Sequence, residues 1–424
     1  MEKSKKNFFS LFPALSSRNY RLYFMGQTVS LVGTWLQVVA EGWLVITFTK
    51  SPFIIGLIAA LATIPTLFLS AFSGVIVDHF SKYKILFLTQ TLSLVIALIY
   101  GFMTIFHVIN LFEIGILAFL LGVVTALDFP ARQAFTVEMV EKQDLSSAIA
   151  LNSGTFNASR VIGPSVAGIL IGLLGVGGAF ILNGLSYIAV IVALYKMNIH
   201  ERIPETFTDP FKSFKEGLSY SFNHPKIKSL LIFTAFASIF GWSYTTVLPL
   251  LAKSVFHVGA TELGYLFAAA GFGSVLAMVI LSAFAKKVDP MNFIISGNAI
   301  SAIGLIGFTF TRTLFPAYVF LFITGLGVML CFPTINTTLQ HLVPDEIRGR
   351  VMAIYITVFV GFFPIGNFEI GWVSEHVGPE NAIRISAVII FIAGAFLYMA
   401  RDRVEKLHQE YIEASSFNEG QVNL

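Results

Sequence analysis

Apolar runs recur along this chain at short intervals, from about Tyr20 to about Ala400, and short polar segments separate them. Each run approaches the roughly 20 residues that an α-helix needs to cross the hydrocarbon core of a membrane. The period-two alternation that marks the strands of a membrane β-barrel is absent from the sequence. We therefore predict an all-α membrane protein with twelve transmembrane helices, at 19–48, 53–77, 84–106, 111–140, 145–172, 177–196, 226–252, 261–285, 291–310, 314–341, 350–374 and 382–400.

One long polar segment interrupts this pattern and divides the chain into two halves of six predicted helices. The halves also repeat in sequence: an offset of 203 pairs Gly122 with Gly325, Pro130 with Pro333, Gly163 with Gly366 and Gly168 with Gly371, and an offset of 208 pairs Gly33 with Gly241 and Gly56 with Gly264. Such duplication is typical of transporters in which two bundles rock about a central site. The predicted organisation is two pseudo-symmetric six-helix bundles at 19–196 and 226–400, a cytoplasmic loop at 197–225, and cytoplasmic ends at 1–18 and 401–424.

Composition and charge agree with this interpretation. The chain is 56% hydrophobic and only 12% charged, with a mean hydropathy of +0.79. A soluble protein of this size carries far more charge on its surface. Most of the 27 Lys and Arg residues fall in segments that would be cytoplasmic if both termini are inside, so the positive-inside rule predicts an N-in/C-in protein of the cell (inner or plasma) membrane. The single cysteine, Cys331, excludes an intrachain disulfide, and we expect it to fill space in the core.

The first predicted helix carries a line of polar side chains. Five residues follow one another at spacings of 3, 4, 3 and 4, which places them on one face of a helix over about 21 Å. Facing lipid, these groups would cost free energy, and an ionised glutamate would cost several kcal/mol. We interpret the line as the wall of a wet cavity; the alternative is hydrogen bonding in a dry helix–helix interface. Its members are Gln27, Ser30, Thr34, Gln37 and Glu41.

Charged residues also occur within the fourth and fifth predicted helices. Asp128 and Arg132 lie one turn apart, where they can form an ion pair inside the bundle. Asn157 and Arg160 share one face of the next helix. These residues are candidates for the lining of a substrate or proton cavity, but a purely structural network that joins the two helices explains them equally well.

Two glutamates within the predicted transmembrane helices are candidates for proton transfer or for binding a cation. Desolvation favours the neutral form of a carboxyl group, so such a group can take up and release protons near neutral pH. Glu41 is thus a candidate proton carrier, or a counter-ion for a cationic substrate. Glu369, in the eleventh predicted helix, either lines the same cavity or braces that helix against Arg384.

Four stretches of the chain resemble the major facilitator superfamily, and more narrowly its bacterial exporter branch, which includes enterobactin exporters and macrolide or drug efflux proteins. They are "GQTVSLVGTWLQVVAEGWLV" in the first helix, "GVIVDHFSKYK" at 74–84, "ALDFPARQAFTVEMV" at 126–140 and "LNSGTFNASRVIGPSVAG" at 151–168. The stretch at 74–84 resembles a signature of the whole superfamily, and the last two are typical of the branch. The resemblance extends over nearly the whole chain and implies the two-bundle fold of this superfamily.

The resemblance also implies roles for residues at matching positions. The loop between the second and third helices would form a cytoplasmic gate, in which an aspartate caps and pairs with basic side chains. The signature in the fifth helix is associated with exporters: its glycines allow close helix packing, and its proline loosens the helix locally. The gate residues are Gly74, Asp78, Lys82 and Lys84, and the residues of the exporter-like signature are Gly163, Pro164 and Gly168.

The chain departs from the family pattern at positions that bear on proton coupling. His79 stands where the superfamily usually has Arg, and the fourth helix begins "LAFLLGV", without the Arg found in many drug–proton antiporters. Glu41 stands where the branch often has a small or apolar residue. Coupling to protons would therefore depend on Glu41 or Asp128.

These observations predict a secondary active transporter that exports a small amphipathic compound, such as a drug or a siderophore-like molecule, in exchange for protons. Alternatives are a transporter of lysolipids or other solutes with the same fold, or a non-transporting membrane receptor. The sequence lacks a "GxxxxGK[ST]" nucleotide loop and its eight His residues are dispersed, so we expect neither an enzyme nor a bound metal or cofactor. The expected partners are the substrate, protons and the lipid bilayer, with no nucleic acid, and we expect a monomer.

Overall fold

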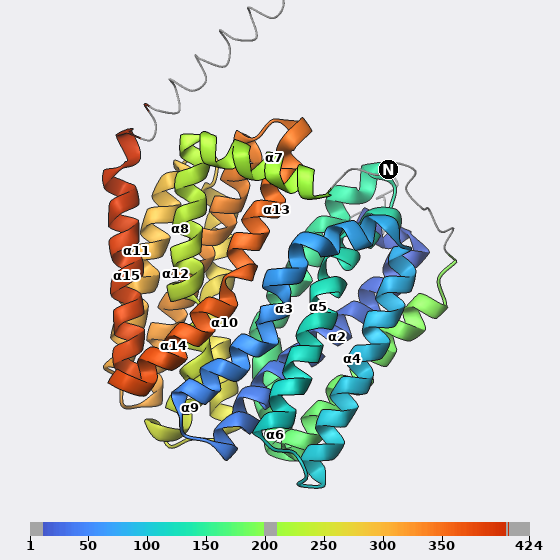
Figure 1. Ribbon diagram of the computed structural model, residues 1–424, viewed down its shortest axis with the longest axis vertical. Coiled ribbons are helices and arrows are strands. Elements are labelled where there is room, and N and C mark those ends of the chain that lie inside the picture. The colour runs from blue at the N-terminus through green and yellow to red at the C-terminus, as the bar shows by residue number, and fades with distance from the viewer. Residues whose placement is uncertain (1–11, 199–209, 404–405, 407–424) are drawn as a thin grey trace, which may run out of the picture. The chain divides into compact units, whose positions relative to one another are not determined.

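The computed structural model describes residues 12–198, 210–403 and 406, and the secondary structure within these ranges is helical (Figure 1). Two short 3₁₀ helices, η1 (Pro13–Ser16) and η2 (Lys142–Asp144), precede longer α-helices. The α-helices are α2 (Arg18–Phe48), α3 (Pro52–His79), α4 (Lys82–Ile105), α5 (Leu111–Glu138), α6 (Leu145–Tyr195), α7 (Pro210–Asn223), α8 (Pro225–Gly241), α9 (Tyr244–Ser254), α10 (Ala260–Phe284), α11 (Pro290–Thr309), α12 (Leu314–Leu342), α13 (Asp345–Gly361), α14 (Phe363–Val377) and α15 (Pro379–Met399).

Within the described ranges, eleven helical stretches are long and apolar enough to cross a membrane. They follow the predicted ranges closely, and the expected all-α membrane fold is confirmed at this level. The 51 residues of α6 cover the predicted fifth and sixth helices, and Gly175, with φ 72° and ψ 173°, interrupts α6 in the gap predicted between them. Glycine adopts this backbone conformation without the steric cost that a side chain would add.

The structure differs from the prediction where two predicted helices are each divided in two and where part of the predicted loop is helical. The predicted seventh helix is divided into α8 and α9 near Trp242, and the eleventh is divided into α13 and α14 near Phe362. Part of the segment 197–225, which was expected to be a loop, is the helix α7. Residues 199–209 of that segment, and the tail from residue 407, lie outside the described ranges.

Local sequence explains where several helices begin. The Asn110 side chain accepts a hydrogen bond of 3.4 Å from the backbone N–H of Glu113, while the Glu113 side chain accepts one of 2.8 Å from the backbone N–H of Asn110. This reciprocal pair is a capping box, which satisfies N–H groups that have no partner within α5. Asp289 similarly accepts from the N–H of Met291 at the start of α11, at 2.8 Å.

The chain forms two compact units. Unit 1 comprises residues 1–50, 61–207 and 249–271, and unit 2 comprises residues 51–60, 208–248 and 272–424. In unit 1, buried Tyr20, Tyr23 and Phe135 belong to a core between α2, α5 and α6, and the hydroxyl of Tyr20 donates to the carbonyl of Ala148 at 3.0 Å. This core holds together the helices of unit 1 that carry the polar side chains described below.

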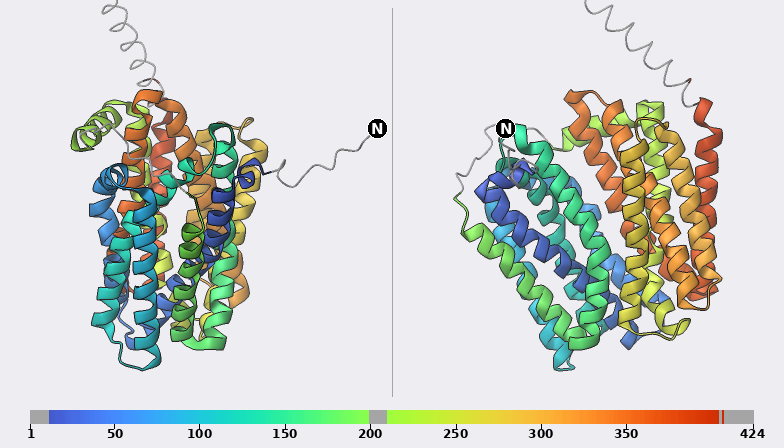
Figure 2. Two further views of the ribbon diagram at one scale, coloured as in Figure 1. Left: turned by 90° about the vertical axis from the view of Figure 1, so that its right-hand side faces the viewer. Right: turned by 180° about the vertical axis from the view of Figure 1, so that it is seen from behind.

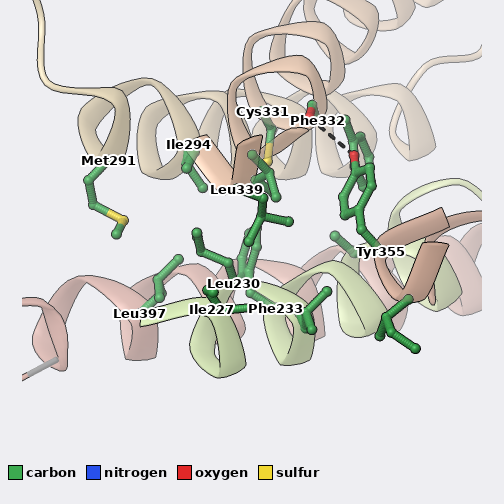
Figure 3. Close-up of a cluster of buried hydrophobic side chains, with 14 of the residues drawn as sticks. Ile227, Leu230, Phe233, Met291, Ile294, Cys331, Phe332, Leu339, Tyr355 and Leu397 are labelled. Atoms are coloured by element: carbon green, nitrogen blue, oxygen red, sulfur yellow. Dashed lines mark hydrogen bonds between the residues drawn. The ribbon is translucent and has the colours of Figure 1, made fainter. Parts of the chain in front are cut away.

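Unit 2 has its own core of buried side chains from five helices (Figure 3). The hydroxyl of Tyr355 on α13 donates to the carbonyl of Phe332 on α12 at 3.3 Å, which is the dashed line in the figure. Cys331 is free and buried in this core, as expected for a residue that fills space. Other members drawn there are Ile227, Leu230, Phe233, Met291, Ile294, Leu339 and Leu397.

Each unit includes a short piece from the other half of the sequence, and close glycine contacts occur at both pieces. Within unit 2, a Cβ built on Gly56 would lie only 2.7 Å from the Cα of Gly371. Within unit 1, a Cβ on Gly264 would lie 3.0 Å from the Cα of Gly168. The sequence repeat pairs Gly56 with Gly264 and Gly168 with Gly371, so the two contacts are equivalent under the repeat.

Candidate functional site

Glu41 ends the polar line on α2 and is half-buried within unit 1. Gln37, one turn earlier, donates from Nε2 to Oε2 of Glu41 over 3.5 Å, which is a long hydrogen bond. Asn183 on α6 donates from Nδ2 to Oε1 of Gln37 at 3.0 Å. Tyr100 on α4 also lies within hydrogen-bonding reach of the Glu41 carboxyl group. Three helices therefore meet around this one acid.

The rest of the polar line divides between buried and exposed positions. Gln27, Ser30 and Gln37 are buried, whereas Thr34 is exposed. Between them, Gly33 packs so closely on α6 that a Cβ would lie 2.2 Å from Oγ of Ser186. Gln37 thus takes part in a hydrogen-bonded contact between α2 and α6. That the polar line borders a wet cavity stays a prediction.

Asp128 on α5 is almost fully buried and accepts hydrogen bonds from two residues of α4. The hydroxyl of Thr89 and Nε2 of Gln90 each donate to Oδ1 of Asp128 at 2.8 Å. Arg132 forms an ion pair with Oδ2, which confirms the pair expected from the sequence. A buried carboxylate with three donors, one of them the cationic Arg132, meets the conditions under which a buried charge is tolerated.

Several polar atoms around this ion pair are buried without a hydrogen-bond partner in the part of the chain that the structure describes. They are Nε of Arg132, Oε1 of Gln90 and the hydroxyl of Tyr23. Such atoms are costly in hydrocarbon unless water or a ligand meets them. The region around Asp128 therefore has unused hydrogen-bonding capacity.

The second charged pair expected from the sequence is less well defined. Arg160 on α6 is half-buried and does have an interaction partner. The side chain of Asn157 lies outside the described part of the structure. Their place in a cavity stays a prediction.

The structure describes only part of the predicted gate. The surroundings of Gly74 and the side chain of Asp78 lie outside what the structure describes. Lys82 forms an ion pair of 3.0 Å with Glu138 at the end of α5. Lys84 is exposed at the start of α4. The role of the four residues as a gate stays a prediction.

The exporter-like signature on α6 is a region of close packing. A Cβ on Gly163 would lie 2.5 Å from the Trp35 ring on α2. Thr261 on α10 donates a 3.1 Å hydrogen bond to the carbonyl of Gly168, and the carbonyl of Pro164 would lie 2.4 Å from a Cβ on Gly264. The signature therefore holds α2 and α10 against α6 within unit 1.

Glu369 on α14 is half-buried, and its Oε2 atom has no hydrogen-bond partner among the residues that the structure describes. Arg384, the suggested partner, instead donates to Oγ1 of Thr309 at 2.8 Å and to Oδ1 of Asn381 at 2.8 Å. Its guanidinium group also lies 4.4 Å from the centre of the Phe310 ring. The structure therefore favours the alternative in which Glu369 does not brace α14 against Arg384.

Unit 2 contains an aromatic cluster that the sequence reasoning did not identify. Trp242, at the break between α8 and α9, stacks on Phe363 at a centroid distance of 5.9 Å, and Phe363 follows the break between α13 and α14. Phe359 contacts both Phe363 at 5.5 Å and Phe332 at 4.7 Å. Trp242, Phe359 and Phe363 are each half-buried. The available signal was an aromatic residue beside Gly241 in "FGWS" and another beside Pro364 in "GFFP".

Hydrocarbon-length helices that repeat in two halves, carry buried charges and contain breaks define a polytopic membrane transporter. The chain belongs to the transmembrane secretion effector family of the major facilitator superfamily, whose sequence profile matches residues 9–424. The expected resemblance is thereby confirmed. The protein is a multi-pass protein of the cell membrane and a transporter rather than an enzyme.

Individual relatives agree with this assignment. The staphyloferrin A transporter of Staphylococcus aureus is 25% identical over 392 residues, which cover 92% of this chain and 98% of that protein. The multidrug efflux pump Tap of Mycolicibacterium fortuitum is 21% identical, with coverages of 87% and 93%. The enterobactin exporter EntS of Citrobacter koseri is 22% identical, with coverages of 92% and 93%. The chain is therefore a superfamily transporter of the exporter type.

A solved structure supports the fold. A bacterial homolog to the human lysosomal transporter Spinster, in an inward-facing and unoccupied conformation, matches with a TM-score of 0.74 and 15% sequence identity. The match covers 93% of this chain and 98% of that chain. At this identity the likeness concerns the fold alone.

Proposed function

We propose that this protein is a secondary active transporter that exports a small amphipathic compound, drug-like or siderophore-like, by alternating access in exchange for protons. The observation that carries the proposal is the position of Glu41, a carboxyl group at membrane depth that is held by neutral hydrogen-bonding side chains. Relatives named for staphyloferrin A, for enterobactin and for multidrug efflux support this substrate class.

The proposal includes a topology. The 51 residues of α6 would span about 77 Å as one straight helix, more than twice the thickness of a membrane core. We take the break at Gly175 to separate two spans, which gives twelve spans in two halves of six, with both termini in the cytoplasm. The bias of Lys and Arg towards the inner segments supports this orientation.

The surroundings of Glu41 suit a group that takes up and releases a proton. The one hydroxyl proton of Tyr100 is donated to the carbonyl of Ile114 at 2.9 Å. The Tyr100 oxygen can then accept a hydrogen bond from Glu41 when the carboxyl group is protonated. Gln37, in contrast, donates to the carboxylate. The site thus offers a hydrogen bond to each protonation state of Glu41.

Asp128 is the second candidate. Three donors hold its carboxyl group, and one of them is the cationic Arg132, so Asp128 suits a fixed charge or a second site of proton exchange that opens only when the network rearranges. The partly exposed rings of Trp242, Phe359 and Phe363 offer an apolar, aromatic surface for the substrate.

Transport in proteoliposomes under an imposed pH gradient tests the proposal, with ethidium as an aromatic probe and a panel of drugs in a pump-deficient host to define substrates. We expect Glu41→Gln to abolish pH-driven transport, and Asp128→Asn to reduce it. Glu346→Gln is the control, because Glu346 is exposed at the start of α13. Full pH-driven transport by both Glu41→Gln and Asp128→Asn would refute the assignment of the proton carrier.

A further inference from the structure

Helix α7 has a surface that the transport cycle does not explain. It lies across the end of unit 2, transverse to the long helices α8 and α13, and it projects to one side of that end (Figure 1; Figure 2, left). Only His224 separates α7 from Pro225, the first residue of the membrane-spanning α8. Interfacial helices, which lie where acyl chains meet phospholipid headgroups, run in the membrane plane in this way.

The inner face of α7 is fixed firmly on α13. Glu216 forms an ion pair with Arg350. Gly217 packs so closely that a Cβ would lie 2.9 Å from the carbonyl oxygen of Arg350. Ser221 on the same side is fully buried. These contacts fix which side chains α7 turns outward.

The outer face of α7 is divided into an apolar row and a basic row. The apolar row follows the i, i+4, i+8 spacing: Phe214 is half-buried, Leu218 is 38% exposed and Phe222 is 50% exposed. The neighbouring row contains Lys212 and Lys215, which are both exposed. Around the helix the order is protein core, exposed apolar side chains, lysines, and then the polar Asn223.

The first turn of α8 continues the basic row. Lys228 is exposed, and its ammonium group lies 5.9 Å from the centre of the Phe222 ring. A lysine stem packed beside an apolar ring, with its charge kept at the edge, is the usual arrangement at a membrane interface.

We propose that α7 is an interfacial helix that binds acidic phospholipids, with Leu218 and Phe222 among the acyl chains and Lys215 and Lys228 at the headgroup phosphates. Around α7, buried side chains, exposed apolar side chains, lysines and a polar residue follow one another. At the edge of a membrane protein, the protein core, acyl chains, headgroup phosphates and water follow in the same order. The charge selects anionic headgroups over zwitterionic ones, because each lysine near such a surface strengthens binding by about fivefold. Exposed phenylalanine and leucine have no favourable environment in water on that face.

Depth measurement by spin labelling tests the position of the helix. A nitroxide is attached in turn to Phe222→Cys and to Asn223→Cys, both in a Cys331→Ala background that removes the single native cysteine. The protein is placed in phosphatidylcholine–phosphatidylglycerol nanodiscs, where oxygen concentrates among the acyl chains and a water-soluble nickel complex stays in the water. We expect oxygen to relax the label at 222 more than the nickel complex does. At 223 we expect the nickel complex to relax the label more than oxygen does. A label at 222 that nickel relaxes as strongly as at 223 overturns the proposal. A label at 222 that neither reagent reaches indicates a protein contact such as a second copy, and also overturns it.

Lipid selectivity tests the charges. Nanodiscs are made from an equimolar mixture of the two lipids, and the lipids retained by the protein are counted by native mass spectrometry. We expect Lys215→Gln/Lys228→Gln to lose most of the wild-type enrichment in phosphatidylglycerol, by about fivefold for each lysine. The matched control Lys286→Gln/Lys287→Gln removes two exposed charges between α10 and α11, and should keep the enrichment. Equal enrichment in both double variants would refute the selectivity. Because both leaflets carry the same lipids, the result does not depend on the proposed orientation or on transport.

Discussion

Asn183 on α6 donates a hydrogen bond of 3.0 Å to Oε1 of Gln37 on α2, and this bond fixes which way the Gln37 amide faces. With its oxygen occupied by Asn183, the amide presents its NH₂ group to Glu41. A residue 146 positions away in sequence therefore orients the donor that faces the acid. Asn183 is a positioning residue by this geometry, and it has no contact with the carboxylate among the hydrogen bonds described.

Replacing Asn183 with Leu should leave Oε1 of Gln37 unpaired in a buried position. We expect a loss of about 1–3 kcal/mol in the free energy of unfolding, because an unsatisfied buried acceptor costs about that much. Unfolding in mixed micelles at increasing denaturant measures this loss. Asn183→Asp is the comparison, since it removes the donor but keeps the size. A variant as stable as the wild type would show that the bond is not formed in the folded protein.

The contributions of Asp128 and Arg132 to the free energy of unfolding should depend strongly on each other. Asp128→Leu leaves the half-buried guanidinium group of Arg132 without its counter-ion, and we expect a loss of up to about 3–5 kcal/mol in the free energy of unfolding. The double variant Asp128→Leu/Arg132→Leu should recover most of that loss, since no charge is then left in the core. The ion pair between exposed Arg312 and half-buried Glu380, 3.2 Å apart, is the control, and Glu380→Gln should cost less than about 1 kcal/mol. Equal losses in the single and double variants would contradict the coupling.

The glycine contacts in the two units should respond alike to a methyl group. Gly56→Ala places a Cβ 2.5 Å from the carbonyl of Asn367, and Gly264→Ala places one 2.4 Å from the carbonyl of Pro164. In each case backbone must move, so we expect a loss of about 1–3 kcal/mol in the free energy of unfolding. Gly349→Ala is the control, because no atom lies within 4 Å of its built Cβ. Thermal unfolding in detergent compares the three, and a stable Gly56→Ala would show that the contact is loose.

Trp242 should contribute to the binding of aromatic substrates. If its ring forms part of the substrate surface, Trp242→Leu should raise the KM for an aromatic probe such as ethidium by about 2- to 10-fold, which corresponds to one lost aromatic contact. The KM for an aliphatic cation of similar size should change less. Trp372→Leu is the control, because Trp372 is 52% exposed on α14 and packs on His376 instead. Saturation kinetics in proteoliposomes give both constants, and equal KM values for the wild type and Trp242→Leu would exclude the contact.

The sequence alone determined the class of fold, most span boundaries and the repeat. These features depend on local quantities: the length of an apolar run, the capping residues at its ends, and landmarks at a fixed offset. The repeat positions could be matched from the sequence because a fixed offset relates them: 208 residues pair Gly56 with Gly264, and 203 residues pair Gly168 with Gly371. The ion pair of Asp128 and Arg132 was equally accessible, because one helical turn brings the two side chains together.

Only the tertiary structure decided which partners these residues have across helices. Thr89 and Gln90 bind Asp128, Asn183 binds Gln37, and Trp242 meets Phe363 across two helix breaks. Periodicity gives the face of a helix on which a side chain lies, but not the neighbour that the face meets, because that depends on how helices distant in sequence pack and rotate. For the same reason the polar line on α2 was predictable as a line, whereas the burial of Gln27, Ser30 and Gln37 and the exposure of Thr34 were not.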